Sequence, residues 1–422
     1  MRQVNRQAAT IKAIFRRLGD ARLDLLTDRR DRRGRRYPHL ALVSALALGC
    51  IAASPSLRHV EELTAGLHPK VRRKTKINRR ISDTKLRDEL HTLEADELRA
   101  ALNRQVKAEH RRGNLKPTRL PIGLVAIDGK GLGKLDSWGH PEVQGVFPEG
   151  RPPYGLARVH RAHLVSSKAT VCIDQRPLPG DTNELGAVCK FTAELLAAYR
   201  RADLFEAVIA DAGNCSLGHA SLLHDNDLGY ILAIKEPSGD IYQEAMRCLA
   251  ELAPEKAECE RTRREKGRRV IHRFFRVRLP AGFLQWEHAR QLIRIQRVTE
   301  KDDGTTTSGD RFFVTNLPYG RLIPAQWLAA VRLYWRCENN GHWTADVVWR
   351  EDAKRTPWTR QPAAVYALAL LRMLALNILA IMRAMSRREY CSKPPPWLTI
   401  TDAVRLVLAA PTIICSERLI GD

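Results

Sequence analysis

Two short apolar runs that each end in an aspartate decide the fold: Gly123-Leu-Val-Ala-Ile-Asp128 and Glu206-Ala-Val-Ile-Ala-Asp211. Continuous apolar runs of this length are typical of strands buried on both faces of a sheet. A single aspartate after a strand is more often a turn former or a helix cap. Here small residues follow both aspartates, and small residues let a metal ion and a DNA backbone approach closely. The two runs therefore predict paired strands that end at a functional site.

The elements around these runs predict an α/β fold. We expect strands at 123–128, 158–164, 170–175, 206–211 and 229–235, with a hairpin turn at 166–168 and helices at 183–201 and 216–224. Three strands followed by helix, strand, helix and strand is the order of a ribonuclease-H-like catalytic core. In that arrangement the first and fourth strands are neighbours, which would place Asp128 and Asp211 side by side.

A third acidic residue, Glu338, lies in the block Arg332-Leu-Tyr-Trp-Arg-Cys-Glu-Asn-Asn-Gly-His-Trp343. We expect a helix over 324–339, on which Glu338 shares a face with Tyr334, Trp335 and His342. An ordinary solvated carboxylate would explain the glutamate but not its aromatic and basic neighbours. Two strand-end aspartates and one helical glutamate suit two-metal phosphoryl transfer, because hard divalent cations prefer oxygen ligands.

The chain divides into regions of different character. We expect a helical, basic, DNA-binding domain at 1–118, a catalytic core at 119–235 and 321–390, a β-rich insertion at 236–320 and a C-terminal tail at 391–422. The insertion holds strand-like runs at 270–279, 291–298 and 311–315, a turn at 302–309 and a basic loop at 261–269. A helix at 363–385 would pack against the core.

The charge indicates a polyanionic partner. The formal net charge is +23 and the pI is about 10.0. Residues 1–120 hold 29 Lys and Arg against 13 Asp and Glu, and so contribute 16 of the 23 net charges. The densest basic runs are 29–36 and 71–80, for which nucleic acid is a better reading than a merely solvated face. We expect DNA contacts from Arg35, Arg36, Arg72, Arg73, Lys74, Lys130, Lys235, Arg332, Arg336, His342 and Trp343.

Several of these contacts have a plain structural alternative. Trp343 would either stack on a base or pack in the core, and His342 would either meet the scissile phosphate or pack along its helix.

Cysteine usage and hydropathy argue against other classes of protein. The nine cysteines include no CxxC pair, which excludes the usual zinc and secreted-disulfide patterns. The first residues lack the apolar core of a signal peptide. The apolar stretch 40–53 is too short to cross a bilayer, and polar residues interrupt 363–385, so we expect two buried helices and no membrane partner.

Three blocks resemble the bacterial insertion-sequence DDE transposases, in particular their H-repeat-associated branch. The blocks are Ala126-Ile-Asp-Gly-Lys130; His163-Leu-Val-Ser with Asn183-Glu184 and Ile209-Ala-Asp-Ala-Gly213; and Val331 to Val347 closing with Glu351-Asp352. The basic Arg32–Pro38 segment and the helix after it also resemble that branch, so the resemblance spans roughly residues 25–385. Tyr334 and Ala345 stand where the broader superfamily often has Arg and Lys, so the resemblance transfers neither of those two roles.

The resemblance implies a function. Asp128, Asp211 and Glu338 would be the catalytic triad and would bind two Mg²⁺, with Mn²⁺ as a substitute. The protein would bind terminal inverted repeats and target DNA, cleave and transfer strands, act as a homodimer on DNA, and work in the bacterial cytoplasm at the nucleoid. Two alternatives share these residues: a ribonuclease-H-like nuclease that does not transpose, and a catalytically silent, domesticated DNA-binding protein.

Overall fold

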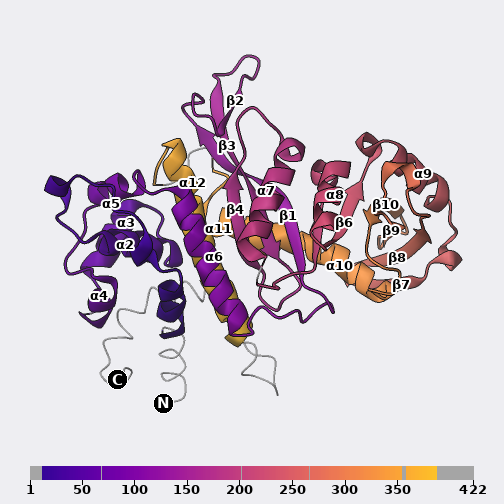
Figure 1. Cartoon of the computed structure of the whole chain (residues 1–422), viewed down its shortest axis with the longest axis horizontal. Coiled ribbons are helices and arrows are strands. Elements are labelled where there is room, and N and C mark those ends of the chain that lie inside the picture. Colours follow the sequence, from indigo (N-terminus) through magenta and orange to yellow (C-terminus); the bar gives the residue numbers. More distant parts are fainter. Residues whose placement is uncertain (1–11, 68, 201, 266, 354–357, 387–422) are drawn as a thin grey trace.

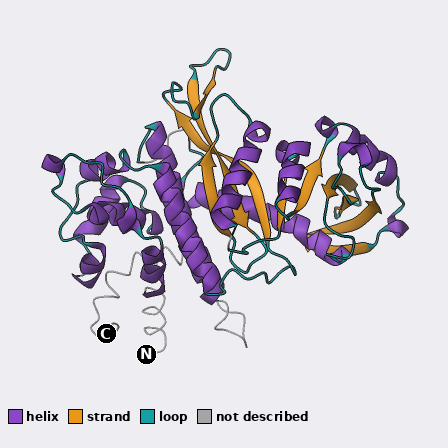
Figure 2. Ribbon diagram, in the orientation of Figure 1, coloured by secondary structure: helices purple, strands orange, loops and turns teal. Residues whose placement is uncertain are grey.

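A large mixed sheet runs through the centre of the protein (Figure 2). The structure is a computed structural model that describes residues 12–67, 69–200, 202–265, 267–353 and 358–386. Within these residues the sheet has ten strands in the order β2-β3-β1-β5-β6-β10-β9-β8-β7, with β4 paired to β3. The strands are β1 (Leu124–Leu135), β2 (Val143–Val146), β3 (Tyr154–Leu164), β4 (Val171–Pro177), β5 (Ala207–Ala210), β6 (Gly229–Ile234), β7 (Cys259–Glu265), β8 (Arg268–Arg278), β9 (Gln291–Glu300) and β10 (Thr306–Thr315).

The two strands that were predicted to end in aspartate are neighbours, as expected from the sequence. β1 pairs in parallel with β5, and Ile127 lies opposite Ala210. β5 pairs in parallel with β6, whereas β3 is antiparallel to β1 and β4 to β3. Asp128 and Asp211, which follow Ile127 and Ala210, therefore lie side by side where the pairing of β1 with β5 ends. The expected end of the first strand at Asp128 is wrong, because β1 continues to Leu135 in antiparallel pairing with β3.

Helices cover both faces of this part of the sheet. Val125 and Ile127 pack with α7 (Glu184–Tyr199) and α8 (Leu217–Asp225). Leu124 and Ala126 pack on the other face with α10 (Pro324–Arg336). Because successive side chains of a strand point to opposite faces, this alternation directs Asp128 toward α10.

The N-terminal helices share one apolar core with the long helix α12 (Pro362–Ser386), and α6 runs beside α12 (Figure 1). These helices are α2 (His39–Ile51), α3 (Leu57–Ala65), α4 (Pro69–Thr75), α5 (Asp83–Leu90) and α6 (Ala95–Arg111), and residues 12–20 are also helical. By length and composition, 362–384 could cross a bilayer, but 94% of its most apolar window is buried inside the protein. The expected tail at 391–422 lies outside the described residues.

The insertion continues the central sheet, because β10 pairs with β6. Helix α9 (Asp240–Leu249) packs over its strands. The expected basic loop at 261–269 is wrong: these residues belong mostly to the paired strands β7 and β8. Strand β2 was not expected, and the predicted turn at 302–309 already gives way to β10 at Thr306.

The helix expected over 324–339 is also not regular throughout. α10 ends at Arg336, a π-helical turn η7 (Cys337–His342) follows, and α11 (Trp343–Trp349) completes the segment. The widened turn packs against β3, because a Cβ added to Gly341 would lie 2.6 Å from Nε2 of His163. π-turns often occur at functional sites, and this one carries Glu338.

Candidate metal centre

Three carboxylates converge where the parallel pairing of β1 with β5 ends. They belong to Asp128 in β1, Asp211 directly after β5 and Glu184, the first residue of α7. One oxygen of each lies within 4.8 Å of the other two, and all three residues are half-buried. Like charges this close repel one another strongly, so the cluster needs a proton or a cation to be stable.

Local sequence features hold Glu184 in this cluster. The Asn183 side chain caps α7 by accepting a hydrogen bond from the backbone N–H of Gly186 at 2.9 Å. The carboxylate of Glu184 then lies over Gly129, where an added Cβ would be 1.9 Å from its Oε1. A side chain at position 129 would displace Glu184, so the glycine makes room for a protein carboxylate.

The environment favours the protonated form of Asp128. Burial, followed by the charges of Asp211 and Glu184, raises the pKa of Asp128 to about 7. The Tyr334 hydroxyl donates to its Oδ1 at 3.2 Å and the Cys337 thiol to its Oδ2 at 3.7 Å, and both oppose this rise. Burial and the charge of Asp211 also raise the pKa of Glu184.

Asn214 links the other two carboxylates. Its Nδ2 donates to Oδ1 of Asp211 at 2.8 Å and to Oε2 of Glu184 at 3.4 Å. Its Oδ1 lies 3.1 Å from Nε2 of His160, whose pKa burial lowers to about 4. A neutral His160 must carry its proton on Nε2 to donate to this carbonyl oxygen, so the histidine fixes which way the amide points.

Glu338 lines the same pocket as Asp128 and Asp211 but does not belong to the tight cluster. The pocket has a volume of about 350 Å³, and the side chain of Glu338 is exposed. The structure thus brings the three sequence-predicted carboxylates to one cavity, and Glu184 joins two of them, Asp128 and Asp211, in the tight cluster. Oxygen donors of this kind and number suit a hard divalent cation such as Mg²⁺ or Mn²⁺, and bound cations would relieve the repulsion.

His342 lies beside Asp128 and contacts a second buried histidine, His163. His342 is 6% exposed, and its Nδ1 lies 3.5 Å from Oδ2 of Asp128. Burial lowers the pKa of His342, and burial lowers that of His163 to about 3. The two rings meet edge to face at a centroid distance of 5.6 Å. Both imidazoles are neutral, so neither forms an ion pair with Asp128.

The remaining residues predicted near the site lie in different settings. The ammonium of Lys130 lies 2.5 Å from a carboxylate oxygen of Asp346 in α11, whereas Lys235 is exposed and lines the acidic pocket. Trp343 is 60% exposed, so it is not a core residue. Arg332 and Arg336 line a second, adjoining cavity.

The N-terminal arginines also differ from one another. The guanidinium of Arg72 donates hydrogen bonds to the carbonyl oxygens of Thr64, Ala65 and Leu67, and so caps the C-terminal end of α3. Arg35 forms an ion pair with Asp28, with 3.3 Å between its Nε and Oδ2 of the carboxylate. Arg36, Arg73 and Lys74 are exposed, which suits a contact with a partner.

Sequence reasoning assigned no role to Glu184. An acidic residue in the first turn of a helix is common because it complements the helix dipole, so its local pattern carries no special signal. The hint in the sequence was that Glu184 follows the Asn183 cap, within a block that resembles insertion-sequence transposases.

Comparison with known proteins does not identify a family. No family model matches the sequence, and no curated protein matches it. Among solved structures, a cryo-EM structure of a piggyBac transposase synaptic complex with hairpin DNA is similar at a TM-score of 0.44 and 9% identity, covering 90% of this chain and 72% of that chain. At that TM-score the likeness establishes neither the fold nor the function of this chain.

Proposed function

We propose that this protein is a DNA transposase that cleaves and joins strands with divalent-metal chemistry at Asp128, Asp211 and Glu338. The observation that carries the proposal is the convergence of carboxylates where the parallel pairing of two adjacent strands ends. The strand order β4-β3-β1-β5-β6 supports the proposal of a ribonuclease-H-like core. The resemblance of three sequence blocks to insertion-sequence transposases supports transposition rather than simple nuclease activity.

Asp128, Asp211 and Glu184 would hold the metal ions together with Glu338. A bound pair of divalent cations would supply the Lewis acidity that activates the attacking oxygen and stabilises the leaving one. The protein's own groups keep the ligands in place: Tyr334 and Cys337 hold Asp128, and Asn214 holds Asp211 and Glu184. Lys235 is exposed at the same pocket, where its side chain would contact a phosphate.

DNA is the partner that the charge of the chain favours. The net charge of +23 calls for a polyanion, and phosphate contacts would make binding strongly dependent on salt. Transposition joins two ends of one element, so we expect at least two copies of the protein on the DNA.

The test uses DNA that flanks the gene, supplied as a fragment carrying both ends of the element. Asp128→Asn, Asp211→Asn and Glu338→Gln should each abolish Mg²⁺-dependent cleavage and leave end binding in a gel-shift titration largely intact. Asp136→Asn, in an exposed residue outside the pocket, is the matched control. Full cleavage by one of the three variants would remove that residue from the catalytic set.

A strand-transfer assay with pre-cut ends separates the alternatives. A transposase joins the ends to a target plasmid. A nuclease cuts the fragment but joins nothing, and a silent DNA-binding protein binds the ends without cutting.

A further inference from the structure

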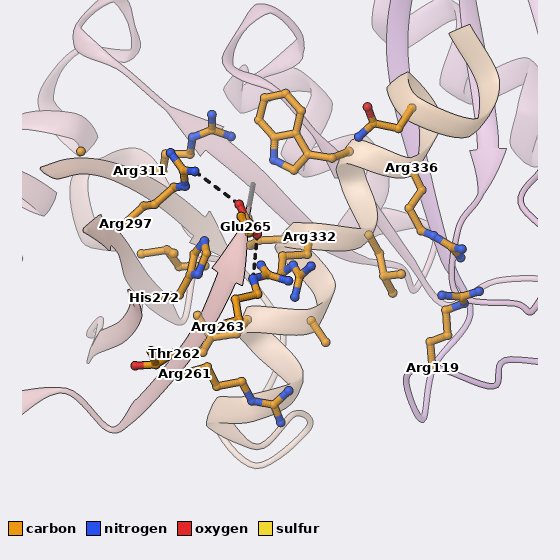
Figure 3. Close-up of a pocket in the computed structure, with 18 of the residues that line it drawn as sticks. Arg119, Arg261, Thr262, Arg263, Glu265, His272, Arg297, Arg311, Arg332 and Arg336 are labelled. Carbon is orange, nitrogen blue, oxygen red and sulfur yellow. Dashed lines mark hydrogen bonds and ion pairs between the residues drawn. The ribbon is translucent and has the colours of Figure 1, made fainter. Parts of the chain in front are cut away.

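A cavity of about 970 Å³ adjoins the acidic pocket, and arginines dominate its lining (Figure 3). Arg261, Arg263, Arg297 and Arg311 reach it from the insertion strands, and Arg332 and Arg336 from α10. Arg119 enters from the segment before β1. Among the described lining residues, Glu265 is the only carboxylate, and it lies 2.7 Å from Arg263 and 3.4 Å from Arg297. We name this space the arginine cavity.

The register of the strands explains how the positive charges gather on one wall. Arg261 pairs with His272, His272 with Arg297, and Arg297 with Gly309, so these four residues lie in one row across four strands. Residues that pair across strands point to the same face of the sheet, and all four line the cavity. Two arginines of this row, Arg261 and Arg297, therefore direct positive charge into the cavity from the same face of the sheet, where an anion could neutralise it.

The arginine cavity and the acidic pocket are adjacent spaces with a common wall. Val331, Trp335 and Arg311 line both. The guanidinium of Arg311 lies 4.3 Å from the centroid of the Trp335 ring, where the two spaces meet. A chain of phosphates with one phosphate at the carboxylates would continue past this pair into the arginine cavity.

We propose that the arginine cavity binds a single DNA strand, the one that continues from the phosphate held at the acidic pocket. Arginines approach from two walls, the insertion sheet and α10, so they can surround the backbone of one strand. The backbones of a duplex are accessible only from its outside, so they could not be surrounded in this way. Basic side chains along a groove together with an aromatic ring are the usual features of single-strand sites. The choice of DNA rests on the proposed function, whereas the presence of an anion site does not.

Arg261 and Arg332 are the best residues for a test. They stand on opposite walls, and within the described residues neither side chain has a hydrogen bond or an ion pair. Arg264 and Arg269 supply the control, because they lie opposite each other on β7 and β8 and are not part of the cavity lining; Arg269 also pairs with Glu300 at the surface. Arg264 alternates with Arg263 along β7 and so points to the opposite face.

The experiment measures binding of a fluorescent oligodeoxythymidine and of a duplex of equal length by anisotropy, with the full chain in a chelator. Arg261→Ala/Arg332→Ala should weaken single-strand binding at least about tenfold at low salt and reduce the slope of log K against log salt by about 1.4. Duplex binding should change less than about twofold, as should single-strand binding by Arg264→Ala/Arg269→Ala. Arg261→Lys/Arg332→Lys should restore most of the affinity, because lysine keeps the charge.

An equal loss in the control pair would overturn the assignment of the cavity, and an equal loss of duplex binding would overturn the assignment to a single strand. Because the chelator removes the metal, a protein that never cleaves DNA can still pass this test. Failure of the cavity and failure of the proposed activity are therefore separate results.

Discussion

The raised pKa of Asp128 makes a prediction about stability that needs no DNA. The folded protein holds this carboxyl at a pKa of about 7, against 3.8 for the ordinary group. A difference of about 3 pKa units corresponds to about 4 kcal/mol. Between pH 4 and 7 the folded state keeps a proton that the unfolded chain releases, so the stability of the metal-free protein falls as the pH rises through this window. The loss is complete above pH 7.

Asp128→Asn removes the charge and with it this loss. In a chelator at pH 8 the variant should be more stable than the wild type by up to about 4 kcal/mol, and the difference should vanish near pH 4. Adding Mn²⁺ at a hundred times its dissociation constant should stabilise the wild type by about 2.7 kcal/mol and leave the variant nearly unchanged. The difference in free energy of unfolding between the two proteins should therefore become smaller. The assay is urea unfolding followed by tryptophan fluorescence at several pH values.

Asp136→Asn serves as the control, because that carboxylate is 73% exposed and pairs with Arg360 at the surface. Its effect should stay below about 1 kcal/mol at every pH. If Asp128→Asn were less stable than the wild type at pH 8 in the chelator, or if the difference were the same at pH 4 and pH 8, the reasoning about the carboxylate cluster would be refuted.

Three further predictions concern the same site and its support. Gly129→Ala should displace Glu184 and weaken Mn²⁺ binding in calorimetry, whereas Gly131→Ala, whose new Cβ would meet nothing closer than 4.0 Å, should not; equal effects would contradict the packing argument. Metal binding should release the Asp128 proton, so the apparent Mn²⁺ dissociation constant should rise about tenfold from pH 8 to pH 6, and Glu184→Gln should move this dependence to lower pH; a flat profile would count against it. Glu351→Gln should cost about 3–5 kcal/mol in urea unfolding, since it leaves the buried Arg161 unpaired; a loss below about 1 kcal/mol would show that the pair is not needed.

The sequence predicted what depends on short-range pattern. Two apolar runs ending in aspartate predicted neighbouring strands, and Ile127 does lie opposite Ala210. Helical spacing could not reveal the π-turn after Arg336, because one inserted residue per turn leaves the composition of a helix unchanged. The arginine-rich 261–269 segment resembled a solvated loop, since only its partners on β8 and β9 make it a sheet.

Glu184 shows most clearly what the sequence alone could not predict. Its contribution exists only because α7 starts beside Asp128 of β1 and the end of β5, and such proximity between distant segments has no local signature. Gly129 is a related case. The sequence showed that the residue at position 129 is small, but it did not show that the Glu184 carboxylate occupies the space beside it.

The core shared by the N-terminal helices and α12 has a consequence for synthesis of the chain. Leu42 and Leu46 of α2 are fully buried in a cluster that also contains Leu371 and Leu374 of α12. α6 ends at Arg111 and α12 ends at Ser386, so at about 5–20 residues per second the first helices wait on the order of tens of seconds for their last partner. Nascent chains expose this apolar surface to chaperones during that interval, and products terminated before α12 cannot complete the fold. Only a chain that has been extended through α12 can finish its N-terminal half.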